Sequence, residues 1–361
     1  MKGSKDTFLK GIENLKIIGR EEQFGIMTSL KIFFFYVFLC CLAKYQEIEG
    51  KVFFVNGESE RKRKDPTGGE YKRLYARRFS NSIDDLINKW TVVSPLSKRV
   101  RFRAIIHALF HSPCGGHYKG RYLEFLLLNR LFTCSNISKT ASFGHYDEFT
   151  YWLSEISTNY HIKYSMFQHG VVSDKIELPT KIKCNEIWLY NNYSEKAFRE
   201  RIIENEDCVY HSNIFISNVT FKNIHREKRK FYVGIIDQTY EVWLKELVEA
   251  LKDLENVIEV IMLHPLSTLR EAECKENIII TKDKYFNLDC IISESSTLFL
   301  DYFYAGYKGA MICTKREIVE EVFGEYPLIY VEKKEIAKKV LQLKLECEAA
   351  DAENTNSKNH S

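Results

Sequence analysis

Residues Leu288–Cys313, LDCIISESSTLFLDYFYAGYKGAMIC, decide the fold of this chain. The segment opens with the apolar run Leu288–Ile292, which is typical of a strand buried on both faces. Hydroxyl side chains follow, then a helical stretch over Ser295–Ala305, and then a second apolar run, Ala310–Cys313. A strand, a helix and a strand in this succession predict two parallel strands of one sheet.

The same alternation extends in both directions through the second half of the chain. Glu241–Leu254 is an expected amphipathic helix, and Lys333–Leu345 is an expected terminal helix. Ile318–Phe323 is a third expected helix. Further strands are expected at Phe231–Ile236, Val257–Leu263 and Ile278–Ile280, with a last one that ends at Val331.

The first half of the chain shows the alternation in shorter pieces. Strands are expected at Lys51–Val55, Thr140–Phe143, Ile162–Phe167 and Glu186–Tyr190. Helices are expected at Asp84–Trp90, Arg101–Phe110 and Asp147–Ser157, and at Ser194–Asn205 with Ser194 as its N-cap.

One apolar run, Ile32–Ala43 (IFFFYVFLCCLA), requires a choice between membrane and core. A membrane-spanning helix needs about 20 apolar residues, and this run is shorter. We therefore expect a buried strand over Leu30–Phe35 that leads into a core helix ending near Tyr45.

These elements predict an α/β protein with two Rossmann-like, doubly wound domains that face a cleft. A length of 361 residues agrees with two domains, because single cores stop growing at roughly 250–300 residues. We expect an N-terminal Rossmann-like domain over residues 27–208 and a C-terminal Rossmann-like domain over 231–346. The remaining segments are expected to be an N-terminal extension (1–26), a linker (209–230) and a disordered tail (347–361).

Composition narrows the function classes. Apolar residues make up 45% of the chain, which excludes disorder over its whole length. The 52 basic residues nearly balance the 49 acidic ones, so we expect no nucleic-acid partner. The ten cysteines are scattered without a Cys-x-x-Cys pair, which is typical of buried thiols in a reducing, cytoplasmic compartment.

Three polar clusters follow expected strands, where ligands bind in open parallel sheets. Gln168-His169-Gly170 offers an imidazole that can act as general base on a hydroxyl. His264-Pro265 offers a second imidazole that can stabilise a departing phosphate. In the third cluster, Ser295, Ser296 and Thr297 open a helix, whose free N–H groups suit a phosphate, and Glu294 precedes them.

Two weaker patterns were weighed beside these clusters. Asp147 and Glu148 open a helix, where acids usually complement the dipole but can also orient an acceptor or act as base. His107, His111, Cys114 and His117 have the residue types of a zinc site, but the metalloprotease glutamate is absent. We expect no metal and no cofactor.

We expect the basic run Glu60–Arg78 to form a loop and the start of a polar helix, and its charges have two interpretations. A charge run of this kind is usually a solvated face, and it can also bind an anionic membrane surface or an anionic acceptor.

The order of the three clusters resembles bacterial surface-polysaccharide transferases of the GT-B fold. The segment Ile291–Ile312 is similar to the pattern of CDP-glycerol glycerophosphotransferases, with paired hydroxyls, an aromatic-rich helix and then Gly before a strand. Bacterial sialyltransferases share the His-Pro and the serine pair but carry Asp-Asp-Gly where this chain has Gln168–Gly170. The resemblance covers about residues 140–325.

The resemblance implies a metal-independent transferase that moves a sugar or polyol phosphate from a nucleotide-activated donor to a hydroxyl. His169 would be the catalytic base, and His264 would hold the donor phosphate together with Pro265, Ser295, Ser296 and Thr297. Glu294 would accept a bond from a sugar or ribose hydroxyl. Beside these roles, we name Gln168 and Gly170, which flank His169, and Asp147 and Glu148 at their helix start as candidate acceptor contacts.

The resemblance also implies an acceptor that is a surface glycan or a lipid-linked sugar. The enzyme would then be cytoplasmic, with peripheral contact at the inner face of the plasma membrane. Two alternatives remain: an epimerase of nucleotide sugars with the same layout, and a non-catalytic partner in polysaccharide assembly.

Overall fold

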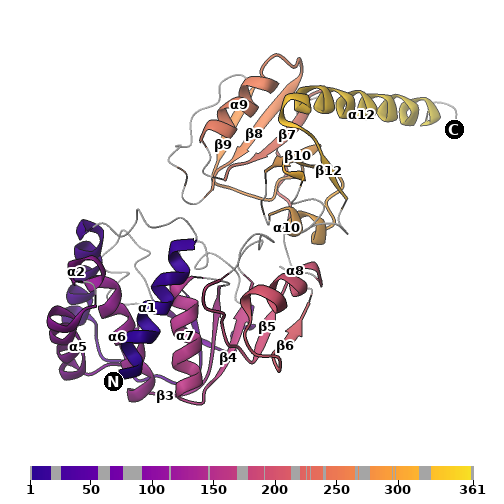
Figure 1. Ribbon diagram of the computed structural model, residues 1–361. Helices are drawn as coiled ribbons and strands as arrows, with labels where there is room; N and C mark the ends of the chain where they lie inside the picture. Colours follow the sequence, from indigo (N-terminus) through magenta and orange to yellow (C-terminus); the bar gives the residue numbers. More distant parts are fainter. Residues whose placement is uncertain are drawn as a thin grey trace. The chain divides into compact units, whose positions relative to one another are not determined.

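The computed structural model describes residues 2–17, 26–55, 66–75, 92–113, 115–144, 147–168, 178–190, 192–212, 220–224, 226–227, 229–238, 241–264, 267, 277–294, 296, 298–316 and 327–358. The chain divides into two compact units, Met1–Ile214 and Phe215–Ser361, here called the N-terminal and C-terminal units. Each unit contains one six-stranded parallel sheet (Figure 1). The predicted fold class of two parallel α/β domains is therefore confirmed.

The sheet of the N-terminal unit has the strand order β2-β1-β3-β4-β5-β6. Its neighbouring strands are all parallel. The direction in which strands are added to the sheet reverses between β1 and β3, because β2 lies on one side of β1 and β3 to β6 lie on the other. The strands are β1 (Glu49–Val55), β2 (Lys72–Tyr75), β3 (Asn136–Phe143), β4 (Lys163–Phe167), β5 (Glu186–Trp188) and β6 (Val209–His211).

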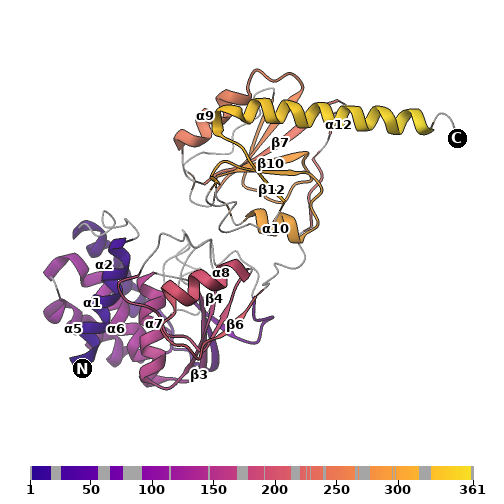
Figure 2. The same cartoon turned by 45° about the vertical axis from the view of Figure 1, so that its right-hand side comes forward.

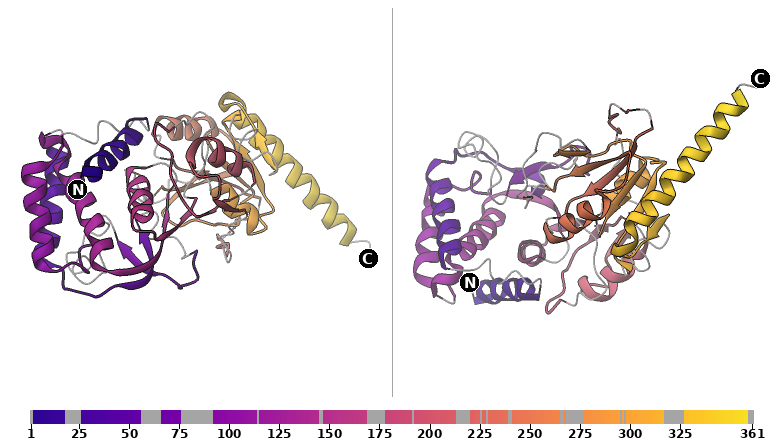
Figure 3. Two further views of the ribbon diagram at one scale, coloured as in Figure 1. Left: turned by 60° about the horizontal axis from the view of Figure 1, so that its bottom comes forward. Right: turned by 90° about the horizontal axis from the view of Figure 1, so that it is seen from above.

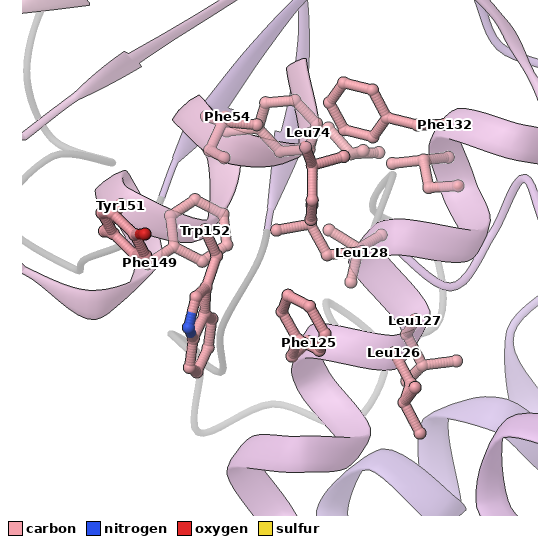
Figure 4. Packing of buried hydrophobic residues seen from close by; sticks show 14 of the residues in the cluster. Phe54, Leu74, Phe125, Leu126, Leu127, Leu128, Phe132, Phe149, Tyr151 and Trp152 are labelled. Carbon is pink, nitrogen blue, oxygen red and sulfur yellow. The ribbon is translucent and has the colours of Figure 1, made fainter. Parts of the chain in front are cut away.

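Both faces of this sheet are covered by apolar side chains. Phe54 of β1 packs against Phe132 of α6 (Lys119–Cys134) and Phe149 of α7 (Glu148–Asn159), with ring centroids 6.1 Å apart in each pair (Figure 4). On the other face Phe53 contacts Phe143 of β3, and these rings belong to a separate buried cluster. Coverage of both faces is the requirement that a parallel sheet imposes on its helices.

The N-terminal helix α1 (Lys2–Ile17) is part of this core. Phe8 is fully buried and stacks on Trp152 of α7, whose indole Nε1 donates a hydrogen bond of 3.2 Å to the Phe8 carbonyl oxygen. Asn14 of the same helix donates from Nδ2 to Thr180 O. Residues 2–17 of the expected extension are therefore a docked helix.

The expected strand Leu30–Phe35 is wrong, because α2 (Ile26–Leu42) is one continuous helix. Its buried residues Ser29, Phe33, Tyr36 and Cys40 recur at helical spacing, a period that the uninterrupted apolar run conceals. Among the described residues, no helix combines the length and the apolar character that crossing a bilayer requires.

The buried Arg101 joins α2 to α5 (Lys98–His111). Its guanidinium donates to the carbonyl oxygens of Cys40 and Ala43, at 3.2 and 2.6 Å, and to Ser94 O at 3.2 Å. Cys40 and Ala43 lie at the end of α2, where the last carbonyl groups of a helix lack the next turn as a partner, so one charged group satisfies acceptors there. A short 3₁₀ helix, Gly115–Tyr118, leads from α5 to α6.

Other elements of the N-terminal unit depart from the sequence predictions. The strand β2 lies inside the basic run that was expected to be loop and helix, and α6 was not predicted at all. Ser194 lies within α8 (Asn192–Ala197), which continues as a π-helical turn over Phe198–Ile202, and is not the N-cap. The strand β6 occupies residues that were assigned to the linker. The expected helix Asp84–Trp90 lies outside the described residues.

The C-terminal sheet has the order β12-β11-β10-β7-β8-β9, and its neighbouring strands are all parallel. This is the strand order of dinucleotide-binding domains. The direction in which strands are added to the sheet reverses between β7 and β10, and this point is here called the switch. The predicted strands of this half are confirmed with small shifts at their ends. They are β7 (Phe231–Ile236), β8 (Val257–Met262), β9 (Ile278–Thr281), β10 (Cys290–Ser293), β11 (Ala310–Cys313) and β12 (Leu328–Tyr330).

Helices cover both faces of the C-terminal sheet. One face packs against α9 (Glu241–Leu251) and α12 (Ile336–Lys358), and the other packs against α10 (Leu298–Tyr304). A 3₁₀ turn, Lys333–Glu335, precedes α12. Figure 2 shows α12 continuing past the sheet toward the C-terminus. Residues 347–358, expected to be disordered, are helical, because Ala and Glu continue the helix beyond its last buried turn.

Glu259 is a buried carboxyl in the middle of β8. Its side chain lies among apolar residues, and Oε2 has no hydrogen-bond partner among the described residues. Burial raises the pKa of Glu259 from 4.5 to about 7. The folded protein therefore retains this proton to a higher pH than the unfolded chain does, and the carboxyl lowers stability progressively as the pH rises from about 4.5 to 7.

The variant Glu259→Gln removes the ionisable group while it keeps the shape of the side chain. We expect the free energy of unfolding to rise at pH 8 by about 1–3 kcal/mol, and by much less at pH 5. Urea denaturation at the two pH values measures both differences. The exposed Glu255→Gln is the matched control, and an equal gain from Glu259→Gln at both pH values would contradict the raised pKa.

Candidate functional site

The candidate site lies at the carboxyl ends of β7, β8 and β10 in the C-terminal unit. Asp237 directly follows β7, His264 follows β8 after one residue, and Glu294 directly follows β10. The strands β7 and β10 flank the switch of direction, and β8 lies next to β7. Ligands of doubly wound sheets bind at such a switch, so this edge has the position of a binding site.

Asp237 and His264 are joined by a hydrogen bond. The main-chain N–H of His264 donates to Asp237 Oδ2 at 3.2 Å, and the N–H of Asp237 donates to Met262 O at 3.0 Å. Asp237 is 3% exposed, so its carboxylate is held in place by burial as well as by these bonds. The pair fixes the backbone of His264 where the chain leaves β8.

Sequence reasoning did not include Asp237 among the site residues. The available signal was its position, immediately after the apolar run FYVGII of the first strand in the domain. That strand became the centre of the sheet only once the order of the strands was known.

His264 is half-buried. Its main-chain carbonyl oxygen accepts a hydrogen bond from Ser267 N in a turn. Burial lowers the pKa of His264 below 6.5, and the nearby Lys284 lowers it further, while Asp237 raises it. The ring is therefore neutral near pH 7 and carries one N–H donor and one acceptor. A neutral ring of this kind can donate to a phosphate oxygen.

The segment after β10 is held by its own local bonds. Glu294 forms an ion pair of 3.6 Å with Lys315, and its carbonyl oxygen accepts from Cys313 Sγ at 3.1 Å. Ser296 Oγ accepts from Leu298 N at 3.2 Å. The buried Ser293 at the end of β10 leaves its Oγ without a partner among the described residues. A polar edge thus begins at the end of β10.

The helix that follows is shorter than expected. Its described part is Leu298–Tyr304, and Ser296 is not helical, whereas the sequence predicted a start at Ser295. A short helix presents a weaker dipole, so the strand-end position of this segment is a better guide to binding than its helix N-terminus.

In the N-terminal unit Gln168 follows β4 and is 1% exposed. Its Nε2 donates to Ser194 Oγ at 3.1 Å, and its Oε1 accepts from Tyr190 N at 2.8 Å. Its own N–H donates to Trp188 O at 2.9 Å. These bonds make Gln168 a residue that positions the end of β4, where we expected acceptor contact.

The two acids at the start of α7 also have partners within the unit. Asp147 is the N-cap, and its Oδ1 accepts from Thr150 N at 2.6 Å. The buried Glu148 lies 3.6 Å from Arg121, which also pairs with Glu124 at 2.9 Å. Both acids therefore stabilise the helix start, which was the structural alternative considered from the sequence.

Several predicted site residues lie outside the described part of the chain: His169, Gly170, Pro265, Ser295 and Thr297. Of the four residues with the types of a zinc site, the structure describes His107, His111 and His117, and Cys114 lies outside the described residues. The rings of His107 and His111 are tilted by 35° with their centroids 4.8 Å apart, and His107 Nε2 lies 3.3 Å from Tyr122 Oη. Within the described residues, no group of three or more potential ligands could hold a metal ion.

Comparison with known proteins adds to this description. No protein-family model matches the sequence, and the search of curated proteins gives no match. Among solved structures, the chain is similar to the spinosyn rhamnosyltransferase SpnG complexed with thymidine diphosphate. The two chains share 9% identity over 82% of this chain and 91% of that one, with a TM-score of 0.50.

Two further structures are similar at lower TM-scores. The glycotransferase of kitacinnamycin is 9% identical over 82% of this chain and 90% of that one, at 0.46. MnaA of S. aureus, in a co-structure with UDP, is 8% identical over 83% and 87%, at 0.49. The likeness to the rhamnosyltransferase concerns the fold, and it confirms that the two six-stranded α/β domains match the GT-B glycosyltransferases.

The pKa of His264 can be measured directly by an NMR titration of the histidine side chains. We expect His264 to titrate below 6.5, and Lys284→Met to raise its pKa because a neighbouring positive charge is removed. Asp237→Asn should lower the pKa further, because a favourable negative charge is lost. The exposed Lys282→Met is the control. A His264 pKa that does not change in Lys284→Met would contradict the assigned environment.

Proposed function

We propose that this protein is a glycosyltransferase, or a polyol-phosphate transferase, that uses a nucleotide-activated donor. The strand order of the C-terminal unit carries the proposal, because it brings Asp237, His264 and Glu294 to the switch between β7 and β10. The C-terminal unit binds the donor, and the N-terminal unit supplies acceptor contacts. The rhamnosyltransferase with a similar fold is described in complex with thymidine diphosphate, which supports a nucleotide ligand.

In this proposal His264 donates to an oxygen of the donor phosphate, with its backbone held by Asp237. Ser295, Ser296, Thr297 and Pro265 complete the phosphate site, and Glu294 accepts from a sugar or ribose hydroxyl. Donors aimed at the leaving phosphate stabilise the charge that develops as the bond to the transferred group breaks. The imidazole and the polar segment after β10 perform this role, so the proposal assigns no metal.

His169 is the proposed general base. It takes the proton of the acceptor hydroxyl as that oxygen attacks the transferred group, and the nucleotide leaves with the phosphate oxygen of the broken bond. Gln168 supports this role from the preceding position through its buried amide bonds. The proposed acceptor is a surface glycan or a lipid-linked sugar, and the proposed compartment is the cytoplasm.

Donor binding can be tested by calorimetry with CMP, CDP, UDP, GDP and thymidine diphosphate. We expect one of them to bind, and His264→Ala to weaken that binding about tenfold, because one hydrogen bond to a charged group is lost. The exposed His117→Ala of the N-terminal unit is the matched control and should leave the affinity unchanged. Failure of every nucleotide to bind would favour the non-catalytic alternative.

Transfer can be tested with the donor that binds. We expect His169→Ala to keep its nucleotide affinity and to lose at least about 100-fold in the rate of nucleotide release in the presence of acceptor, because a general base contributes that much. A mass spectrum of the acceptor product checks the transfer itself. Conversion of the donor alone into an epimer would contradict the proposal and identify an epimerase.

A further inference from the structure

An apolar face of the N-terminal unit lies open to solvent on α2 and α5. This surface, here called the α2/α5 face, includes Met27, Phe34 and Phe38 of α2 and Phe102, Ile106 and Phe110 of α5. Phe34, Phe102 and Phe110 are 65%, 64% and 76% exposed. Single exposed apolar residues are ordinary on protein surfaces, but a cluster of large ones marks a contact with another phase or molecule.

The two helices form one layer. Both pack against α6 and against each other, and Figures 1 and 3 show them on the outer side of this unit. The contact of α2 with α6 is close at Gly120, where an added Cβ would lie 2.4 Å from Ser29 O. Arg101 fixes the N-terminal part of α5 to the end of α2.

The exposed stripes follow from the helical period. In α2 the buried Ser29, Phe33 and Tyr36 alternate with the exposed Met27, Phe34 and Phe38. In α5 the buried residues are Arg101, Ala104 and Ala108, and the exposed side chains lie between them along the sequence. Each helix therefore buries one face in the unit and presents a second apolar face outward.

The charged residues of α2 and α5 are all of one sign. Neither α2 nor α5 contains Asp or Glu, while Lys31, Lys98, Arg99 and Arg103 are exposed on them. Within the described residues none of these four side chains takes part in an ion pair. The face thus combines large apolar rings with positive charges that have no acidic neighbours on their own helices.

We propose that the α2/α5 face binds the surface of a bilayer that contains anionic phospholipid. Aromatic and aliphatic side chains enter the boundary between headgroups and acyl chains, and basic side chains pair with the anionic headgroups. Self-association through this face would instead bring positive charges together across an apolar contact. The inference deepens the proposed function, because a lipid-linked acceptor lies at such a surface, but lipid binding is measured without any donor.

Sedimentation of the full chain with vesicles tests the proposal. We expect binding to phosphatidylcholine vesicles with about 30% phosphatidylglycerol and weaker binding to phosphatidylcholine alone, because the headgroup charge contributes. The double variant Phe102→Ser and Phe110→Ser should lose at least about tenfold in affinity for the anionic vesicles. Arg99→Glu with Arg103→Glu should lose at least about tenfold on anionic vesicles and little on neutral ones.

Two matched variants of the C-terminal unit control for general changes in surface character. Val242→Ser with Leu345→Ser removes exposed apolar groups, and Lys334→Glu with Lys338→Glu reverses exposed charges. Both should bind vesicles as the unchanged protein does. Light scattering of each protein in solution reports its oligomeric state, and nucleotide affinity reports the donor site.

Three outcomes would overturn the inference. The unchanged protein does not bind anionic vesicles, or the α2/α5 variants bind as well as the controls do. In the third, the protein is a dimer that Phe102→Ser with Phe110→Ser dissociates, without binding vesicles, which would identify the face as a self-association surface. Loss of vesicle binding with intact nucleotide affinity leaves the proposed function untouched, and loss of nucleotide affinity leaves the lipid inference untouched.

Discussion

The organising constraint of this protein is that parallel sheets bury both of their faces. Each strand must therefore be followed by a connection that crosses back over the sheet, and the chain leaves every strand at the same edge. In the C-terminal unit this constraint gathers Asp237, His264 and Glu294, which are separated by up to 57 positions in the sequence, at one edge. The chemistry proposed for the protein depends on that edge.

The sequence predicted the C-terminal unit better than the N-terminal unit for a physical reason. Phe231–Ile236 is an unbroken apolar run, and Val257–Met262 is interrupted only by Glu259. Short, mostly apolar runs between polar residues are typical of strands buried on both faces. The edge strand β2 has the sequence KRLY, which contains no apolar run that would mark it as a strand. In α2 an almost unbroken apolar run hides the helical period, because one outward face is apolar as well.

The candidate site was predicted in part. The rule that ligands lie beyond the carboxyl ends of strands selected His264 and Glu294 correctly as strand-end residues. It could not show that the polar atoms of Gln168, Asp147 and Glu148 form hydrogen bonds and an ion pair within the N-terminal unit. Partners that are distant in the sequence leave no local signature. Asp237 was missed because the central place of β7 in the sheet follows only from the order of the strands.

The bonds from Arg101 to the end of α2 have a consequence for any process at the outer layer of the N-terminal unit. A buried guanidinium that satisfies carbonyl oxygens at the end of another helix joins the two helices within the folded unit. Two helices that are already folded lose little conformational entropy when they adsorb. A segment that must fold on contact loses much of its binding free energy to ordering. Adsorption of this kind would require no change in secondary structure.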